Sequence, residues 1–223
     1  MHPTDNITST LIFSGILLAS SSAFAIFMIR RFRVLLAAAP SDRFSDVGKR
    51  MMGILRFFIG QGRILNPKYI GAGIMHAVIF WGFLAVMINS IHFIGRGFVT
   101  DWSLPLFGSG ELLSNLYLPF VDLFEIGVLI MVIWAGIRRV IIKPIRVTNS
   151  WDAALILGLI GSLMLTDILI RGAEATVGES SPLGNSLAGL FSSMGIETVN
   201  FVFTVSWWLH LITLTFFIAY LPV

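Results

Sequence analysis

The stretch from Tyr69 to Ile94 reads YIGAGIMHAVIFWGFLAVMINSIHFI and contains no Asp, Glu, Lys or Arg. A helix of about 20 mainly apolar residues is long enough to cross the hydrocarbon core of a bilayer. We therefore expect this stretch to form a transmembrane helix. It also contains two histidines, His76 and His92, although ionisable side chains are costly in lipid.

Four further stretches are also long and apolar enough to cross a bilayer. With the first, they give five predicted spans, at about 9–29, 69–94, 120–140, 152–170 and 199–221. The chain has 223 residues, of which 56% are hydrophobic and 12% charged, far from the balance of a soluble domain. The stretches lack the alternation typical of barrel strands, so helices must satisfy the backbone in lipid. We predict a single all-α domain, 1–223, forming an integral membrane bundle.

The basic residues predict the orientation, because Lys and Arg are retained on the cytoplasmic side. Thirteen of the fifteen lie between the first and second spans or after the third: Arg30, Arg31, Arg33, Arg43, Lys49, Arg50, Arg56, Arg63, Lys68, Arg138, Arg139, Lys143 and Arg146. This places the N-terminus outside and the C-terminus in the cytoplasm. The formal charge of +3 then reflects topology and contact with anionic lipid, with no implication of nucleic acid binding.

The remaining segments give fewer signals. Residues 47–59 mix basic and apolar side chains, which predicts a cytoplasmic amphipathic helix that anchors at the membrane surface, docks a soluble partner or lines a quinone site. The outer loops resemble short caps on the bundle. The basic residues follow the first span, so we interpret it as a retained anchor. Cysteine is absent, so we expect no iron-sulfur cluster on this chain.

Three histidines, His76, His92 and His210, fall inside predicted spans. An imidazole is neutral at physiological pH and binds iron through one ring nitrogen while the other nitrogen contacts a neighbour. Haem b is therefore the leading interpretation, with these residues as axial ligands. The alternative for each is a histidine hydrogen-bonded to a neighbouring helix.

The number of haems is open. His76 and His92 are sixteen residues apart, which is about 24 Å along a helix and about 160° around it. In a straight bundle, the two histidines therefore cannot both face the fifth span. Small and aromatic residues, Gly73, Phe80 and Phe83, share a face with His76 and suit a porphyrin there.

Charged residues near the span ends are candidates for haem propionates or quinone. They are Arg63, Lys68, Arg96, Arg171 and Glu125. Glu125 is also a candidate proton acceptor if quinol is oxidised on the outer side. We expect most of the polar residues Asn89, Asp122, Glu125 and Asp167 to be interfacial or helix-capping.

Three motifs resemble the nitrate reductase gamma-like membrane domain: Gly60-Gln61-Gly62-Arg63, the segment from Gly73 to Phe83, and Trp207-Trp208-Leu209-His210 with Tyr220-Leu221-Pro222. They are most similar to the version found at the front of heterodisulfide-reductase-like iron-sulfur oxidoreductases, including electron-transfer-flavoprotein:menaquinone oxidoreductases. The resemblance covers nearly the whole chain and is most specific around His76.

The resemblance implies a five-helix cytochrome b in a bacterial- or archaeal-type cytoplasmic membrane. Such a protein passes electrons between quinone or menaquinone and a cytoplasmic iron-sulfur or flavoprotein partner. It implies His76 and His210 as ligands, on one shared haem or on two, and further ligands after the fifth span, so we expect a longer protein. His92 matches no motif position. The alternatives are a haemless anchor for a redox complex and a small-molecule transporter.

Overall fold

The computed structural model describes residues 2–38, 45–108, 110–144, 150–178 and 181–222. These residues form helices and no strand, which confirms the all-α class. Five helices are long and apolar enough to cross a membrane. They are α1 (Ile7–Leu36), α3 (Ile70–Phe98), α4 (Leu112–Ile137, continued by the π-helical turn η3, Arg138–Ile142), α5 (Trp151–Glu174) and α7 (Ile196–Tyr220).

Most of the helices run past the predicted spans. Hydropathy detects the part of a helix that lies in hydrocarbon, whereas backbone hydrogen bonding continues to the cap. The Asn6 side chain accepts a hydrogen bond from the Ser9 N–H at 2.9 Å and so caps α1, and Ser150 caps α5 in the same way. At the start of α4, the helix includes Pro119 and begins at Leu112, eight residues before the predicted start.

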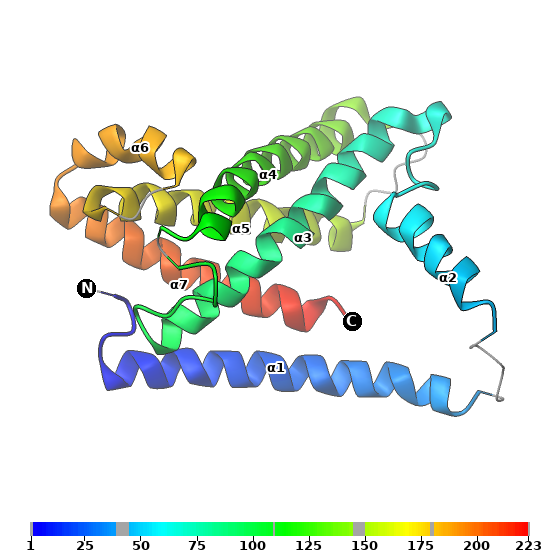
Figure 1. The fold of residues 1–223 in the computed structure, drawn as a ribbon, viewed down its shortest axis with the longest axis horizontal. Coiled ribbons are helices and arrows are strands. Elements are labelled where there is room, and N and C mark those ends of the chain that lie inside the picture. The colour runs from blue at the N-terminus through cyan, green and yellow to red at the C-terminus, as the bar shows by residue number, and fades with distance from the viewer. Residues whose placement is uncertain (1, 39–44, 109, 145–149, 179–180, 223) are drawn as a thin grey trace.

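Successive long helices run in opposite directions (Figure 1). The most extensive contacts join α5 to α7, α3 to α4 and α4 to α5, and α1 packs along α7. We call the end of the bundle where the chain starts the N-terminal end, and the opposite end the basic end. The basic end holds the described residues of the two basic loops, while Arg43 and Arg146 lie outside the described residues. Which end faces the cytoplasm remains the prediction made from those residues.

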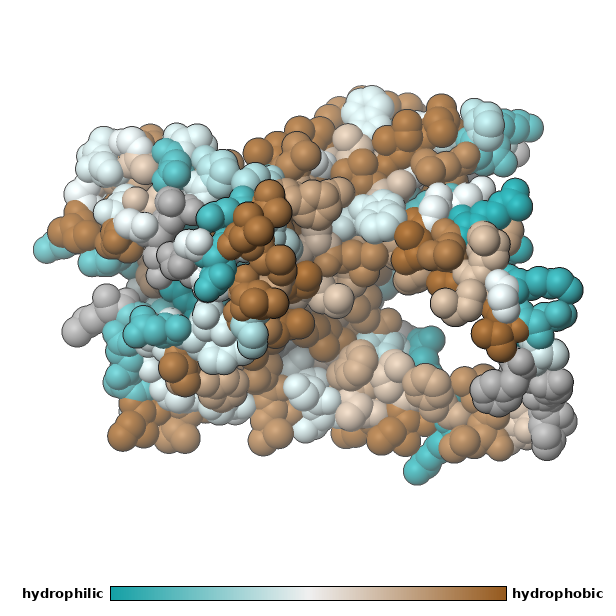
Figure 2. Space-filling view, viewed as in Figure 1, coloured by the Kyte–Doolittle hydropathy of each residue, from teal (hydrophilic) through white to brown (hydrophobic). Residues whose placement is uncertain are grey.

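Shorter helices cover the two ends. At the basic end, α2 (Val47–Gly53) and the π-helical η1 (Ile54–Ile59) form a helical segment, followed by η2 (Pro67–Tyr69). At the N-terminal end, η4 (Ala175–Val177) leads to α6 (Pro182–Ser192), a helix inside a predicted loop. Figure 2 shows apolar side chains over the middle of the bundle and hydrophilic ones toward its ends, as expected for a protein that crosses a membrane.

Glycines allow large side chains to approach the helix backbones. A Cβ atom at Gly82 would lie 2.1 Å from a methyl group of Val128, where α3 meets α4. At Gly97 it would lie 2.3 Å from the ring of Phe13, the one described residue of α1 that is fully enclosed. Small residues at helix contacts are typical of membrane bundles, because packing rather than water exclusion joins the helices.

Candidate functional site

Arg171 of α5 lies at the centre of a buried ionic cluster at the N-terminal end. Its Nη1 donates to Asp122 at 3.0 Å, its Nε donates to Asp167 at 3.2 Å, and its Nη2 lies 3.0 Å from Glu125. All four side chains are at most 7% exposed. The cluster joins α4 to α5, since Asp122 and Glu125 come from α4 and the other two from α5.

The two aspartates have further donors. Asp122 accepts a hydrogen bond of 2.7 Å from the backbone N–H of Leu183, which fixes the start of α6. Asp167 accepts from the Asn89 amide of α3 at 3.1 Å and 3.3 Å. The expectation of interfacial or helix-capping positions is wrong for Glu125 and Asp167, which are buried inside the bundle, whereas Asp122 is buried but does bond the start of α6, and Asn89 is half-buried. The acids are inside the bundle, because Arg171 supplies the compensating charge that a buried carboxylate requires.

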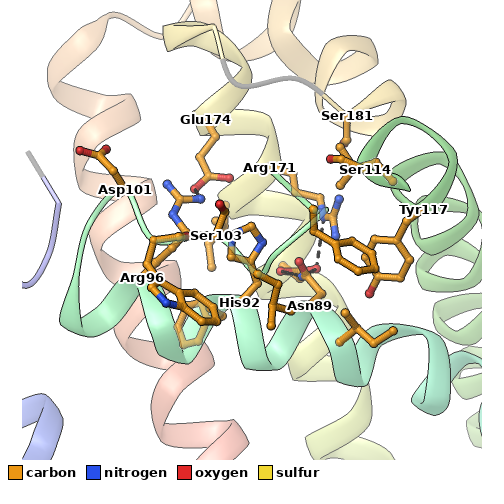
Figure 3. Close-up of a pocket in the computed structure, with 18 of the residues that line it drawn as sticks. Asn89, His92, Arg96, Asp101, Ser103, Ser114, Tyr117, Arg171, Glu174 and Ser181 are labelled. Carbon is orange, nitrogen blue, oxygen red and sulfur yellow. Dashed lines mark hydrogen bonds and ion pairs between the residues drawn. The ribbon is translucent and has the colours of Figure 1, made fainter. Parts of the chain in front are cut away.

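A cavity of about 380 Å³ opens beside the cluster. Figure 3 shows Asn89, His92 and Arg96 rising into it from α3, Arg171 and Glu174 from α5, and Tyr117 from α4. Asp167 also lines the cavity. The Tyr117 hydroxyl donates to the Ala85 carbonyl at 2.6 Å. The cavity thus combines aromatic walls with a few convergent polar groups, which makes it a candidate site for a small ligand.

Besides Arg171, two predicted site residues line this cavity and have protein partners. Arg96 pairs with Glu174 at 2.9 Å. The His92 Nε2 atom lies 2.9 Å from the backbone carbonyl oxygen of Trp102, and the two rings are 5.8 Å apart. Iron binding by Nε2 of His92 would require this hydrogen bond to break.

His210 is 3% exposed and lies between α5 and α3. Its Nδ1 is 2.9 Å from the Thr166 hydroxyl, which donates its own proton to the Ser162 carbonyl at 2.7 Å. With the hydroxyl proton on the Ser162 carbonyl, His210 would donate through Nδ1–H, and this tautomer would leave the lone pair of Nε2 for a ligand. The ring also packs against Phe93, with 4.7 Å between centroids.

His76 lies at a different level of the bundle. On antiparallel α3 and α7, Phe93 meets His210, and Phe83 meets Phe217 with 6.4 Å between centroids. His76 precedes Phe93 by seventeen residues, or about 25 Å along the helix. Two axial ligands of one iron must be neighbours, so this register favours separate sites for His76 and His210.

The environment of His76 is open. Its side chain is exposed and shares a helix face with Phe80 and Phe83, which contact Phe58 of η1 and Phe217 of α7. At Gly73, a Cβ would lie 2.4 Å from the carbonyl oxygen of Ile64. The lack of a side chain at Gly73 therefore admits the preceding loop.

The other basic candidates lie near the surface of the basic end. The Arg63 guanidinium sits 4.7 Å from the ring centre of Phe57. Lys68 lines a second pocket, of about 330 Å³, with Trp134 and Arg138. Within the described residues, no group of three or more His, Cys, Asp or Glu side chains could hold a metal ion. A haem iron needs only two axial ligands from the protein, so a haem site does not require such a group.

The sequence interpretation missed two contributors to the site, Thr166 and Tyr117. Hydroxyl residues are common in membrane helices, so nothing in the sequence distinguished Thr166 from its neighbours. A readable signal did exist for the ion pair, since Asp167 and Arg171 are four residues apart, the spacing at which side chains meet on a helix.

The fold and the site define a helical protein of membrane-spanning type with a polar cavity above a buried ionic cluster. The chain is 29% identical over 228 aligned positions, 94% of its length, to a probable iron-sulfur-binding oxidoreductase, FadF, of Bacillus subtilis (strain 168). It is 30% identical over 207 positions, 84% of its length, to an EtfAB:quinone oxidoreductase of Syntrophomonas wolfei subsp. wolfei.

The chain spans 31% and 28% of the length of these two relatives. No family model matches the chain, and no solved structure matches it. Both relatives are named as oxidoreductases, so the similarity supports a redox-related role in electron transfer.

Proposed function

We propose that this chain is the membrane electron-transfer part of a quinone-linked oxidoreductase and binds haem b. The similarity to two oxidoreductases over 94% and 84% of the chain carries the redox assignment. The five apolar helices support a place in the membrane, and the name of the second relative supports quinone as the substrate class. An iron-sulfur or flavin-containing module is the partner that the relatives' names suggest.

The donor chemistry at His76 and His210 fits haem. His210 presents Nε2 because Thr166 holds Nδ1, and His76 is exposed on a face lined by aromatic rings. Bound haem supplies one-electron redox chemistry, whose potential the protein tunes through the axial ligands and burial. At His210, Phe93 covers the ring and would turn away to admit a porphyrin.

The cavity at the N-terminal end is the proposed site of the quinone head. Asn89, Tyr117 and Asp167 provide hydrogen-bonding groups at its wall, and Phe93 and Trp207 provide aromatic surface beside His210. The residues would orient the head by hydrogen bonds to its oxygens and hold it beside Phe93, which covers the His210 ring. His92 and Arg96 belong to this cavity in the proposal, with His92 retaining its bond to Trp102.

A reduced-minus-oxidised absorbance spectrum of the purified protein tests the proposal. We expect a b-type α-band that is lost in part in His76→Ala and in part in His210→Ala, because the two histidines lie at different levels. His92→Ala is expected to retain the full band, and His2→Ala controls for loss of an imidazole outside the spans. A colourless, folded wild-type protein would instead support a haemless anchor, which the hydrogen bond at His92 favours.

A further inference from the structure

Glu125 differs from the other acids of the ionic cluster in its hydrogen bonding. It is 0% exposed, and its oxygen Oε1 lies 3.0 Å from Nη2 of Arg171. The orientation of this contact is not that of a hydrogen bond. Across the described part of the chain, both Glu125 oxygens and the Nη2 atom lack a hydrogen-bond partner. A buried carboxylate without hydrogen bonds is costly.

The charges of the cluster do not balance if every acid is ionised. Asp122, Glu125 and Asp167 would carry three negative charges against one positive charge on Arg171. The two aspartates each accept from Arg171 and from a second donor, Leu183 N–H or the Asn89 amide. Their donors therefore favour the ionised form. This leaves Glu125 as the acid where a proton, which lowers the net charge of the cluster from −2 to −1, is held at least cost.

Glu125 and Asp167 also contact the same guanidinium, at Nη2 and Nε of Arg171, at 3.0 Å and 3.2 Å. Two carboxylates can only accept, so a hydrogen bond between them requires a proton on one. Asp167 lines the cavity, whereas Glu125 lies behind it. The other titratable groups that face the pair are Asp122, His210 and Tyr117.

We propose that Glu125 holds a proton at neutral pH and exchanges it, through Asp167, with an oxygen of a ligand in the cavity. The step is a proton transfer without electron movement: the O–H bond of Glu125 breaks, Asp167 relays the proton, and an O–H bond forms on the ligand oxygen, the anionic oxygen of a deprotonated hydroquinone. The reverse transfer returns it. The ligand class, the head of a quinone or hydroquinone, rests on the proposed function, while the proton on Glu125 does not.

Infrared spectroscopy of the full chain in lipid nanodiscs tests the proton itself. We expect a carbonyl band of a protonated carboxylic acid at neutral pH that shifts in D₂O. It should be absent in Glu125→Gln and unchanged in Glu111→Gln, a matched control at an exposed position of α4's start. Gln imitates a protonated Glu, so Glu125→Gln should fold with wild-type thermal stability. A wild type without the band, a band that survives Glu125→Gln, or an unfolded Glu125→Gln would each overturn the proposal.

The relay is tested by exchange kinetics. In Asp167→Asn, we expect the D₂O shift of the Glu125 band to become at least tenfold slower, while an unchanged rate would overturn the role of Asp167. Adding a short-chain menaquinone analogue should shift the band in the wild type. If the band is present but the analogue leaves it unchanged and the protein lacks haem, the proposed function fails and the proton site stands. If a haem spectrum is present without the band, the proton site fails and the proposed function stands.

Discussion

The Nδ1 atom of His210 and the Oγ1 atom of Thr166 lie 2.9 Å apart between α7 and α5. We expect Thr166→Val to remove this bond while keeping the shape of the side chain. A residue that hydrogen-bonds the second ring nitrogen of a metal-binding histidine typically contributes 10–100-fold to the affinity of the metal site. In a haem titration, Thr166→Val should therefore lower the affinity of the His210 site by about that factor.

The control for this change is Thr215→Val, since the buried Thr215 hydroxyl bonds to the carbonyls of its own helix. Its haem affinity should stay within a few-fold of wild type. An equal loss in both variants would show that Thr166 acts through packing alone.

Phe13 and Gly97 should be energetically coupled. Gly97→Ala would place a methyl group 2.3 Å from the Phe13 ring, so α1 must shift and the thermal midpoint should fall. Phe13→Ala should also lower the midpoint by removing a buried ring, a change that typically costs about 3–5 kcal/mol in a protein core. The double variant should be no less stable than Phe13→Ala, which a double-mutant cycle in detergent can measure.

Gly15→Ala is the matched control for this cycle, because a Cβ at Gly15 meets no atom within 4 Å. It should leave the midpoint unchanged or raise it slightly, as Ala favours helix over Gly. Additive effects of Gly97→Ala and Phe13→Ala would contradict the close contact between the two residues.

Removal of the Arg171 charge should be severe. Arg171→Met leaves three buried carboxyl groups without their cation, and breaking a buried pair typically costs about 3–5 kcal/mol. We expect little folded protein by size-exclusion chromatography. Arg96→Met, which breaks the partly exposed pair with Glu174, should fold in good yield. Comparable yields of the two variants would indicate that the cluster contributes little to assembly.

His2 should titrate well below an ordinary histidine. Its ring packs 5.3 Å from the Trp207 ring; burial and the Arg96 charge lower its pKa to about 4, against the opposing effect of Asp5. The docked tail therefore favours the neutral ring. Its docking is complete above the ordinary value of 6.5 and weakens as the pH falls toward 4. An NMR titration should give a lowered pKa that rises in Arg96→Met, and an ordinary pKa in both proteins would contradict this contact.

The five spans and the helical segment at 47–59 were predictable because hydropathy and charge pattern report depth in the membrane. The rotation and register of each helix were not, because in an almost wholly apolar helix many faces can pack. Asp167 and Arg171 were therefore assigned to the ends of a span, although their spacing fits an ion pair. For the same reason, the pairing of Phe93 with His210, which separates His210 from His76, required the structure.

Because His76 and His210 are separated along the helices, electron transfer between their two levels would depend on the membrane potential. A unit charge that crosses the whole membrane changes its energy by about 2.3 kcal/mol per 100 mV of membrane potential. An interval of about 25 Å covers most of a hydrocarbon core that is about 30 Å thick. The energy of an electron that moved between the two histidine levels would therefore change by most of the full membrane potential, in a sign set by the direction of transfer.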